Sequence, residues 1–241
     1  MNSSIYYNKG KTREKNEDDY LLAIDDEQKL IAVADGMGGH KAGEVASNLV
    51  INYIQKYNYN INGNIFNDIN NAINEASKEL IKMGKENKKY YNMGTTLSMG
   101  IIHNNKLFIG HVGDSRIYMF RNNKLKLLTK DHSLVNKLLE DNKIDAEQAF
   151  NHPQKHILTQ ALGLNQELKI ENKEVELSSG DLLLFCSDGL TDMVKDEEIK
   201  RILQDKYNKV KNNINEVSEC LGQKALDNGG NDNITLIMVK L

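Results

Sequence analysis

Short apolar runs joined by very short polar segments dominate the middle of the chain. The runs cover residues 95–103, 106–112, 116–121 and 124–128, and the segments between them are 104–105, 113–115 and 122–123. Connections of two or three residues join strands that run in opposite directions, because a parallel crossover needs a dozen residues or more. The pattern therefore predicts antiparallel strands in which each run pairs with the next.

Strand and helix patterns alternate on both sides of this region. Apolar runs predict strands at residues 20–24, 29–34, 168–177, 181–187 and 234–240, with a hairpin turn at 25–28. Helical spacing of apolar residues predicts helices at 42–57 and 65–83, and further helices are expected at 196–204 and 214–227. Two antiparallel sheets with amphipathic helices on their outer faces fit this order best. The predicted fold class is α+β.

The length of 241 residues suits one large domain and would also permit two. No internal repeat or low-complexity linker divides the chain, so we expect a single domain over residues 1–241. Residues 130–165 differ from their surroundings, since they are polar, helix-like over 134–140, and contain the only proline, Pro153. We expect this segment to be a mobile excursion from the sheets.

Composition narrows the function classes. The 31 basic and 34 acidic residues give a net charge of -3, which offers no basic footprint for nucleic acid. The N-terminal residues are polar and lack the apolar core of a signal peptide, and no apolar stretch approaches a membrane span. Cys186 and Cys220 fit buried thiols in a reducing compartment. These features predict a cytoplasmic enzyme.

Acidic residues stand in short glycine-containing or glycine-adjacent motifs along the chain. The motifs are NED at 16–18, ADGMGGH at 34–40, GDSR at 113–116, SDGL at 187–190 and GGNDN at 229–233. Asp35, Asp188 and Asp232 stand at or beside the ends of apolar runs, where strands can aim side chains into a shared site. Carboxylates repel one another, so gathering them is costly unless cations neutralise them. Hard oxygen ligands suit Mg²⁺ or Mn²⁺, so the pattern predicts a metal-dependent hydrolase.

An Asp-Gly pair follows the predicted strand at 29–34. Both carboxylate oxygens of Asp35 are free to bridge two cations there, and Gly36 lacks a Cβ that would keep a backbone carbonyl from a metal. Asp-Gly is also a common turn dipeptide, and for this pair alone the turn interpretation is favoured. The recurrence of the arrangement at Asp188 and Asp232 argues for a shared site.

Glu17 and Asp18, ahead of the predicted strand at 20–24, add to the same candidate site. Two cations about 3.5–4 Å apart lower the pKa of a water between them and clamp a phosphoryl group for in-line attack. Such a centre makes its nucleophile from water, and no Ser-His-Asp or Cys-His elbow is evident in the sequence.

Three further residues have both a functional and a structural interpretation. Arg13 can bind phosphate oxygens through a bidentate guanidinium, or it is a solvated charge in a charged run. Asp114 fits a turn, where it accepts backbone hydrogen bonds, and that role is compatible with metal binding. His40 can donate a proton to a leaving group, although a histidine near a helix start is more often an N-terminal hydrogen bonder.

Together the motifs resemble a known enzyme family. The set RxxxED, DGMGGHxxGExAS, MGTT, GDSR, SDGL and GxNDNIT is similar to that of the metal-dependent serine/threonine protein phosphatases of type 2C (PPM family) in their bacterial form. The resemblance runs in family order from Lys9 to Val239. It implies an αββα sandwich with two core ions, Mn²⁺ or Mg²⁺, in a cleft at one end of the sheets.

The resemblance also implies roles for single residues. The core metal ligands correspond to Asp35 (bridging), Gly36 (through its carbonyl), Asp188 and Asp232 (one metal), and Glu17 with Asp18 in support (the other metal, through water). Arg13 matches the phosphate-binding arginine, and Asp114 with Asp188 matches a third, weaker metal site of bacterial members. Residues 130–165 correspond to a flap beside the cleft, where substrate selection is expected.

The implied partners are phosphorylated proteins, among them a membrane-anchored Ser/Thr kinase of the same cell as antagonist and substrate. We expect a monomer with no nucleic-acid partner and no membrane span. A non-catalytic phosphoprotein-binding module on the same fold should have lost ligands, whereas every expected acid is present. A metal-dependent nuclease is disfavoured by the acidic balance.

Two positions depart from the family pattern. Met37 follows the Asp-Gly pair where animal members have a histidine proposed as the general acid, so the identity of the acid is open. Bacterial relatives commonly share this methionine. In the flap, His156 stands where relatives usually show asparagine, and its effect on selectivity is open.

Overall fold

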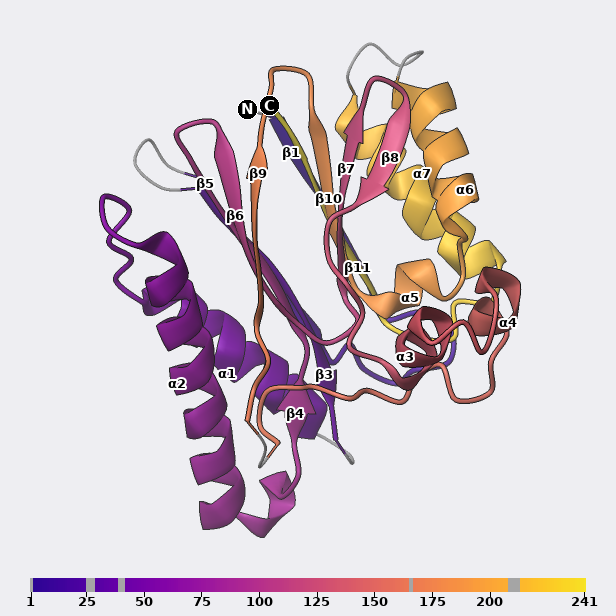
Figure 1. Cartoon of the computed structure of the whole chain (residues 1–241). Helices are drawn as coiled ribbons and strands as arrows, with labels where there is room; N and C mark the ends of the chain where they lie inside the picture. Colours follow the sequence, from indigo (N-terminus) through magenta and orange to yellow (C-terminus); the bar gives the residue numbers. More distant parts are fainter. Residues whose placement is uncertain (1, 25–28, 39–41, 165–166, 208–212) are drawn as a thin grey trace.

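The computed structural model describes residues 2–24, 29–38, 42–164, 167–207 and 213–241. Within them two β-sheets pack face to face, and helices cover both outer faces (Figure 1). This arrangement confirms the predicted α+β class and the αββα layering. The hairpin turn predicted at 25–28 lies outside the described residues.

Both sheets are antiparallel throughout their described pairs. The first contains, in spatial order, β1 (Asn2–Asn8), β11 (Ile234–Lys240), β10 (Leu182–Cys186), β7 (Arg116–Arg121) and β8 (Lys124–Leu127). The second contains β2 (Asp18–Ile24), β3 (Lys29–Met37), β5 (Leu97–His103), β6 (Lys106–Val112) and β9 (Glu171–Glu176), and the short β4 (Gly94–Thr95) pairs with β3. The predicted strands at 168–177 and 181–187 are present but shorter.

Strand β3 shows why the predicted strands are continuous apolar runs. Ile31 and Val33 point into the layer between the two sheets, where they join a cluster with Phe185. Leu30 and Ala32 face the other way and pack beneath the outer helices. Because successive side chains of a strand point to opposite faces, a strand covered on both faces must be apolar along its length.

The long helices form where helical periodicity predicted them. The predictions at 42–57, 65–83, 196–204 and 214–227 correspond to α1 (Ala42–Lys56), α2 (Ile65–Glu86), α6 (Asp196–Ile202) and α7 (Ile214–Asp227). Helix α2 begins after Asn64, whose side chain accepts a hydrogen bond from the Asn67 amide. A π-helical turn, Leu203–Tyr207, follows α6. Helices α1 and α2 cover the sheet that contains β3, and α6 and α7 cover the other (Figure 1).

The prediction that each middle run pairs with the next is wrong between β6 and β7. These strands belong to different sheets, so residues 113–115 form a crossover rather than a hairpin. Three extended residues span about 10 Å, which is the usual spacing of packed sheets. Gly113 has a φ of +113°, and a Cβ on it would lie 2.5 Å from Cβ of Thr96. Glycine therefore allows this abrupt change of sheet.

Sequence patterns did not predict β1. Its polar residues Ser4 and Asn8 hide the strand signal, and the strand forms because β11 supplies backbone partners along its whole length. The hydroxyl of Ser4 is buried and pairs with the Ser218 hydroxyl at 2.6 Å. A buried polar side chain with a partner is tolerated in a packed layer.

The described part of residues 130–165, hereafter the flap, contains two helices. The predicted helix at 134–140 is confirmed as α3 (Leu134–Glu140), and α4 (Ala146–Phe150) was not predicted. Helix α4 starts with a capping box between Asp145 and Gln148, a signal that the sequence contained. Isolated β-bridges join Ser133 to Leu158 and Thr95 to Leu162, so both ends of the flap are anchored. Mobility of the segment between them stays a prediction.

Candidate active site

The acidic motifs meet at one end of the sandwich because of the antiparallel order of the strands. The register of β2 and β3 places Asp18 opposite Asp35. Strand β10 ends at Cys186, which one residue separates from the short helix α5 (Asp188–Thr191), and Asp232 precedes β11. Neighbouring antiparallel strands start and end at the same edge, so residues from distant motifs lie together there.

Four of the predicted carboxylates lie close together, with Asp18 and Asp114 buried and Asp35 and Asp188 partly buried. Burial raises the pKa of Asp35 well above its usual range, and the charges of Asp188, Asp18 and Asp114 raise it further. Burial likewise raises the pKa of Asp18 to about 7. The pKa of Asp114 is raised by burial and then by Asp188. The three carboxylates with raised pKa values hold negative charge at neutral pH when cations neutralise them, whereas the pKa of Asp188 is lowered because favourable interactions, chiefly with His156, together outweigh burial.

Unsatisfied oxygens in this cluster support a cation-binding role. Oδ1 of Asp18 and Oδ1 of Asp188 are buried without a hydrogen-bond partner among the described residues. The other oxygen of Asp18 accepts a hydrogen bond from the Ser187 hydroxyl at 2.8 Å. Buried polar atoms are nearly always paired, and bare carboxylate oxygens are the ligands that Mn²⁺ and Mg²⁺ prefer. The donor set therefore fits such ions.

Gly36 lies in a space that admits no side chain. A Cβ on Gly36 would lie 2.2 Å from the carbonyl oxygen of Gly43 and 2.5 Å from that of Glu17. A Cβ on Gly43 would in turn lie 2.7 Å from the Gly36 carbonyl oxygen and 2.9 Å from Oε2 of Glu17. The Gly36 carbonyl and the Glu17 carboxylate thus border the same small space. Burial raises the pKa of Glu17 as well.

Asp232 lies at the edge of the cluster and pairs with Arg13. Nη2 of Arg13 donates to Oδ2 of Asp232 at 2.7 Å, and the two side chains are 52% and 27% exposed. The structure thus brings the predicted phosphate-binding arginine next to a predicted metal ligand. Its guanidinium retains solvent-facing donors for a further anion.

Asn233 was not predicted as a site residue, although it stands in the GGNDN motif. Its Oδ1 accepts from the Glu17 amide at 2.7 Å. Its Nδ2 donates to the carbonyl oxygens of Lys9 at 3.0 Å and Lys15 at 2.8 Å. One buried side chain therefore holds the segment that carries Arg13 and Glu17.

Thr96, of the MGTT motif, fixes the backbone of Asp35. Oγ1 of Thr96 accepts from the Asp35 amide at 2.9 Å, and the Thr96 amide donates to the Asp35 carbonyl at 2.9 Å. The same hydroxyl pairs with that of Ser115 at 2.7 Å, next to Asp114. Thr96 therefore links the positions of two carboxylates.

Asp192 was missed by sequence reasoning. It caps α5 one helical turn after Asp188, so the two carboxylates lie on the same side of that turn. Two flap residues contact it: Nδ1 of His156 lies 3.2 Å and Nζ of Lys155 3.2 Å from its Oδ2. His156 also lies 3.9 Å from Oδ2 of Asp188. In the sequence SDGLTD the two aspartates are four residues apart, and this spacing could have indicated that Asp192 lies beside Asp188 on one helical turn.

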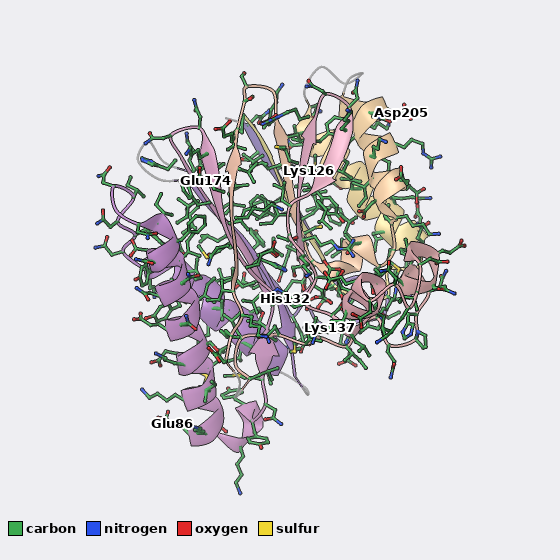
Figure 2. The ribbon with its side chains drawn as sticks, viewed as in Figure 1. Glu86, Lys126, His132, Lys137, Glu174 and Asp205 are labelled. Carbon is green, nitrogen blue, oxygen red and sulfur yellow. The ribbon has the colours of Figure 1, made fainter. Side chains whose placement is uncertain are left out.

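The start of the flap is bound to the crossover that carries Asp114. The His132 amide donates to the Gly113 carbonyl at 2.7 Å, and Nδ1 of His132 accepts from the Gly113 amide at 3.2 Å. Figure 2 shows His132 at the lower ends of the strands, with Lys137 of α3 close by. Beside it, Arg116 forms a bidentate ion pair with Asp131. Hydrogen bonds therefore connect the start of the flap to the segment that carries Asp114.

His40, the candidate proton donor, lies outside the described residues. The other predicted site residues gather around the same acidic end of the sandwich: Arg13, Glu17, Asp18, Asp35, Gly36, Asp114, Asp188 and Asp232. Their placement agrees with a shared site. Their roles toward metal and substrate are proposals.

The arrangement matches known proteins. A sequence model of protein phosphatase 2C matches residues 9–228. The chain belongs to the protein phosphatase 2C family. The serine/threonine phosphatase stp of Listeria monocytogenes serovar 1/2a is 36% identical to this phosphatase over 246 residues, which cover 100% of this chain and 96% of the relative.

Solved structures of similar proteins support the same family. Stp1 from Staphylococcus aureus has a TM-score of 0.91 and 36% identity, with 99% of this chain and 94% of that chain covered. The catalytic domain of PstP, solved in complex with 2 manganese ions, has a TM-score of 0.86 and 32% identity, with 99% and 97% covered. This chain is thus a serine/threonine protein phosphatase, as the motifs predicted.

Within the described residues of the phosphatase, no helix is long and apolar enough to cross a membrane.

Proposed function

We propose that this phosphatase hydrolyses phosphoserine and phosphothreonine in proteins with a water molecule activated between two divalent cations. The observation that carries the proposal is the convergence of Asp18 and Asp114, which are buried, with Asp35 and Asp188, which are partly buried; two of their carboxylate oxygens lack hydrogen-bond partners among the described residues. A structural role would not require so much like charge in one place.

The cations, Mn²⁺ or Mg²⁺, would supply Lewis acidity and lower the pKa of a shared water. Asp35 would lie between them, with Asp188 and Asp232 on one side. On the other side, Glu17 and the Gly36 carbonyl border one small space, with Asp18 in support. Asp114 would bind a third, weaker ion together with Asp188.

The chemistry balances without a covalent enzyme intermediate. The water oxygen bonds to phosphorus while the bond from phosphorus to the serine or threonine oxygen breaks. The leaving oxygen takes up one proton, which the attacking water replaces, and the products are the free hydroxyl and inorganic phosphate. Arg13 would bind the phosphate oxygens by the two-pronged geometry of its guanidinium. His40 is retained as a candidate for the proton donor.

The proposed substrates are phosphorylated proteins, including a Ser/Thr kinase of the same cell that the phosphatase opposes. We further propose a single-domain monomer that acts in the cytoplasm. The anchored ends of the flap support a substrate-selecting surface there, since the flap contacts Asp192 beside the acidic cluster through Lys155 and His156.

Turnover of a small phosphomonoester and of a phosphopeptide, with added manganese and with a chelated control, tests this proposal. We expect activity only with the metal, and a loss of about 100-fold or more in Asp35→Ala and in Asp232→Ala, because no neighbour can replace either charge. Full turnover of a phosphoprotein by either variant, or by the chelated enzyme, would contradict the two-ion assignment. Circular dichroism of the variants controls for folding.

A further inference from the structure

The flap reaches the acidic site through the adjacent residues Lys155 and His156. Nδ1 of His156 lies 3.2 Å from Oδ2 of Asp192 and 3.9 Å from Oδ2 of Asp188. The His156 side chain is 60% exposed, so it can change rotamer at little cost, whereas the two aspartate side chains are 15% and 22% exposed. A flexible nitrogen donor thus faces two fixed carboxylates.

The side chains of His156, Asp188 and Asp192 lie close enough together to bind one metal ion. One ligand atom from each of His156, Asp188 and Asp192 lies within 4.8 Å of the others. Oδ1 of Asp188 is buried without a partner among the described residues. The charges of Asp188 and Asp192 both raise the pKa of Asp114, so that carboxylate lies near this group. A small rotation of the imidazole would bring its nitrogen to binding distance of a shared cation.

We propose that His156 supplies a nitrogen ligand to the third divalent cation, next to Asp188 and Asp192, so that this cation ties the flap to α5. The inference rests on the proposed function, since it concerns the weaker ion of that site. Imidazole nitrogen is a softer ligand than a carboxylate and is rarely chosen by Mg²⁺. The third position therefore prefers Mn²⁺ or another transition metal over Mg²⁺, and its occupation closes the flap over the site.

Lys155 should affect cation binding at Asp192 in the opposite direction from His156. Its Nζ lies 3.2 Å from Oδ2 of Asp192, so its positive charge competes with a cation for that oxygen. If His156 were only a second counter-ion of the same kind, removing it would also free the carboxylates. The two interpretations thus predict changes of opposite sign in metal affinity when His156 is replaced.

Manganese binding by isothermal titration calorimetry, at about pH 8 and thus above the ordinary imidazole pKa of about 6.5, tests the sign. We expect His156→Asn to weaken the weakest manganese site by about tenfold or more, since even losses outside the ligand shell have effects of 10–100-fold. Lys155→Gln should tighten that site. His152→Asn is the matched control, because the imidazole of this flap histidine accepts a hydrogen bond from the nearby Gln154 amide and does not belong to the group formed by His156, Asp188 and Asp192. Tighter or unchanged binding in His156→Asn would overturn the proposal.

Electron spin echo spectroscopy of bound Mn²⁺ gives a readout that does not depend on turnover. The ligands proposed for the two core ions are all oxygen atoms, so coupling to a directly bound imidazole nitrogen reports the third site. We expect this coupling in the wild type and in His40→Asn, and its loss in His156→Asn. A fully loaded wild type without it, or a coupling that persists in His156→Asn, would refute nitrogen ligation.

The measurements distinguish an error in the role of His156 from an error in the two-ion function. If two ions bind and support turnover while no nitrogen coupling appears, only the role of His156 is wrong. If Asp35→Ala binds as many ions as the wild type and turns over phosphopeptide, the proposed two-ion function itself is wrong. Hydrogen exchange of α3 and α4 with Mn²⁺ and with Mg²⁺ then measures flap closure, and slower exchange with Mn²⁺ alone is the expected result.

Discussion

Arg13 can exchange its weak ion pair with Asp232 for stronger hydrogen bonds to a phosphate group. Its ion pair with Asp232 is half exposed, and exposed pairs contribute only about 0–1 kcal/mol. A bound phosphate dianion offers the guanidinium two parallel hydrogen bonds, and a cation at Asp232 would remove the reason for the present pairing. The contact seen in the structure is therefore compatible with a role in substrate binding.

Replacing Arg13 by lysine should not be conservative. Hydrogen bonds to charged groups contribute about 1.5–3 kcal/mol, so Arg13→Lys should lower kcat/KM for a phosphopeptide by about tenfold or more. Manganese affinity should change little, because lysine keeps the positive charge beside Asp232. Lys15→Gln, which removes a cation from an exposed pair with Glu44, is the control. Unchanged kcat/KM in Arg13→Lys would contradict phosphate binding and favour the interpretation of Arg13 as a solvated charge.

Asp114 distinguishes a turn residue from a metal ligand. Asn keeps much of its hydrogen bonding but not its charge, so Asp114→Asn should fold and keep the core ions. We expect phosphopeptide turnover to fall at low manganese and to recover partly at high manganese, because mass action refills a weakened site. Manganese titrations of turnover for the two proteins measure this. Superimposable curves would eliminate a third-ion role.

Single residues were predictable where their motif was specific. Asp35, Asp188 and Asp232 stood at the ends of apolar runs, and the structure brings those runs to one edge of the sandwich. Asp192 was missed because its proximity depends on a four-residue helix, α5, that is too short for any periodicity to show. Asn233 was missed because an amide that organises backbone groups looks, in sequence, like any other turn residue.

At the scale of elements, the start of α1 and the end of β3 form one close contact. Helix α1 approaches the Gly36 carbonyl so closely that Gly43 has no room for a side chain. A glycine in the interior of a helix costs about 1 kcal/mol relative to alanine, and for Gly43, in the first turn of α1, this figure is an upper limit. In return for this loss of helix stability, the absence of a side chain at Gly43 leaves a small space between the Gly36 carbonyl and the Glu17 carboxylate.

Gly43→Ala should therefore weaken metal binding more than it weakens the fold. A Cβ there would lie 2.7 Å from the Gly36 carbonyl oxygen and 2.9 Å from Oε2 of Glu17, so both must shift. We expect manganese affinity to fall by about tenfold or more, on the scale of a disturbed ligand shell. Gly63→Ala is the matched control, because the atom nearest its Cβ belongs to the flexible side chain of Asn60. Equal affinities in the two variants would count against a ligand role for this carbonyl.

Element types followed from periodicity, whereas the pairing of successive strands was correct for β5 with β6 and for β7 with β8 but not for β6 with β7. The run of strands from residue 95 to 128 was expected to form successive hairpins, whereas β6 and β7 belong to different sheets. A three-residue connection is compatible with both arrangements, and only the pairing of β7 with β10 shows which one forms. Strand β1 had no apolar alternation, because its stability comes from β11 at the far end of the sequence.

For the whole molecule, the acidic cluster couples stability to pH and to metal. Burial raises the pKa of Asp18 to about 7, and the pKa of Asp35 and of Asp114 is raised as well. An unfolded aspartate has a pKa near 3.9, so between about pH 4 and 7 the folded chain keeps protons that the unfolded chain releases. This contribution to stability is fully present below about pH 4 and is lost as the pH rises through 7.

The metal-free phosphatase should therefore melt at lower temperature as the pH rises from about 5 to 8. With saturating manganese the carboxylates are ionised in the folded state too, so the decline should shrink or reverse and the melting temperature at pH 8 should increase. Differential scanning fluorimetry with chelator and with manganese across this range measures both effects. A chelated protein that becomes more stable toward pH 8 would contradict the raised pKa values.

The pairing of β1 with β11 has a consequence for synthesis. Ile5 on β1 is paired with Ile237 on β11, and β11 also separates β1 from β10. Because a ribosome releases the N-terminal residues first, β1 waits without its partner until nearly all of the described chain has been made. Such distant contacts slow folding. Asp232 emerges just ahead of β11, so a nascent chain would have neither a complete first sheet nor a complete acidic cluster, and dephosphorylation would begin only after translation has passed both.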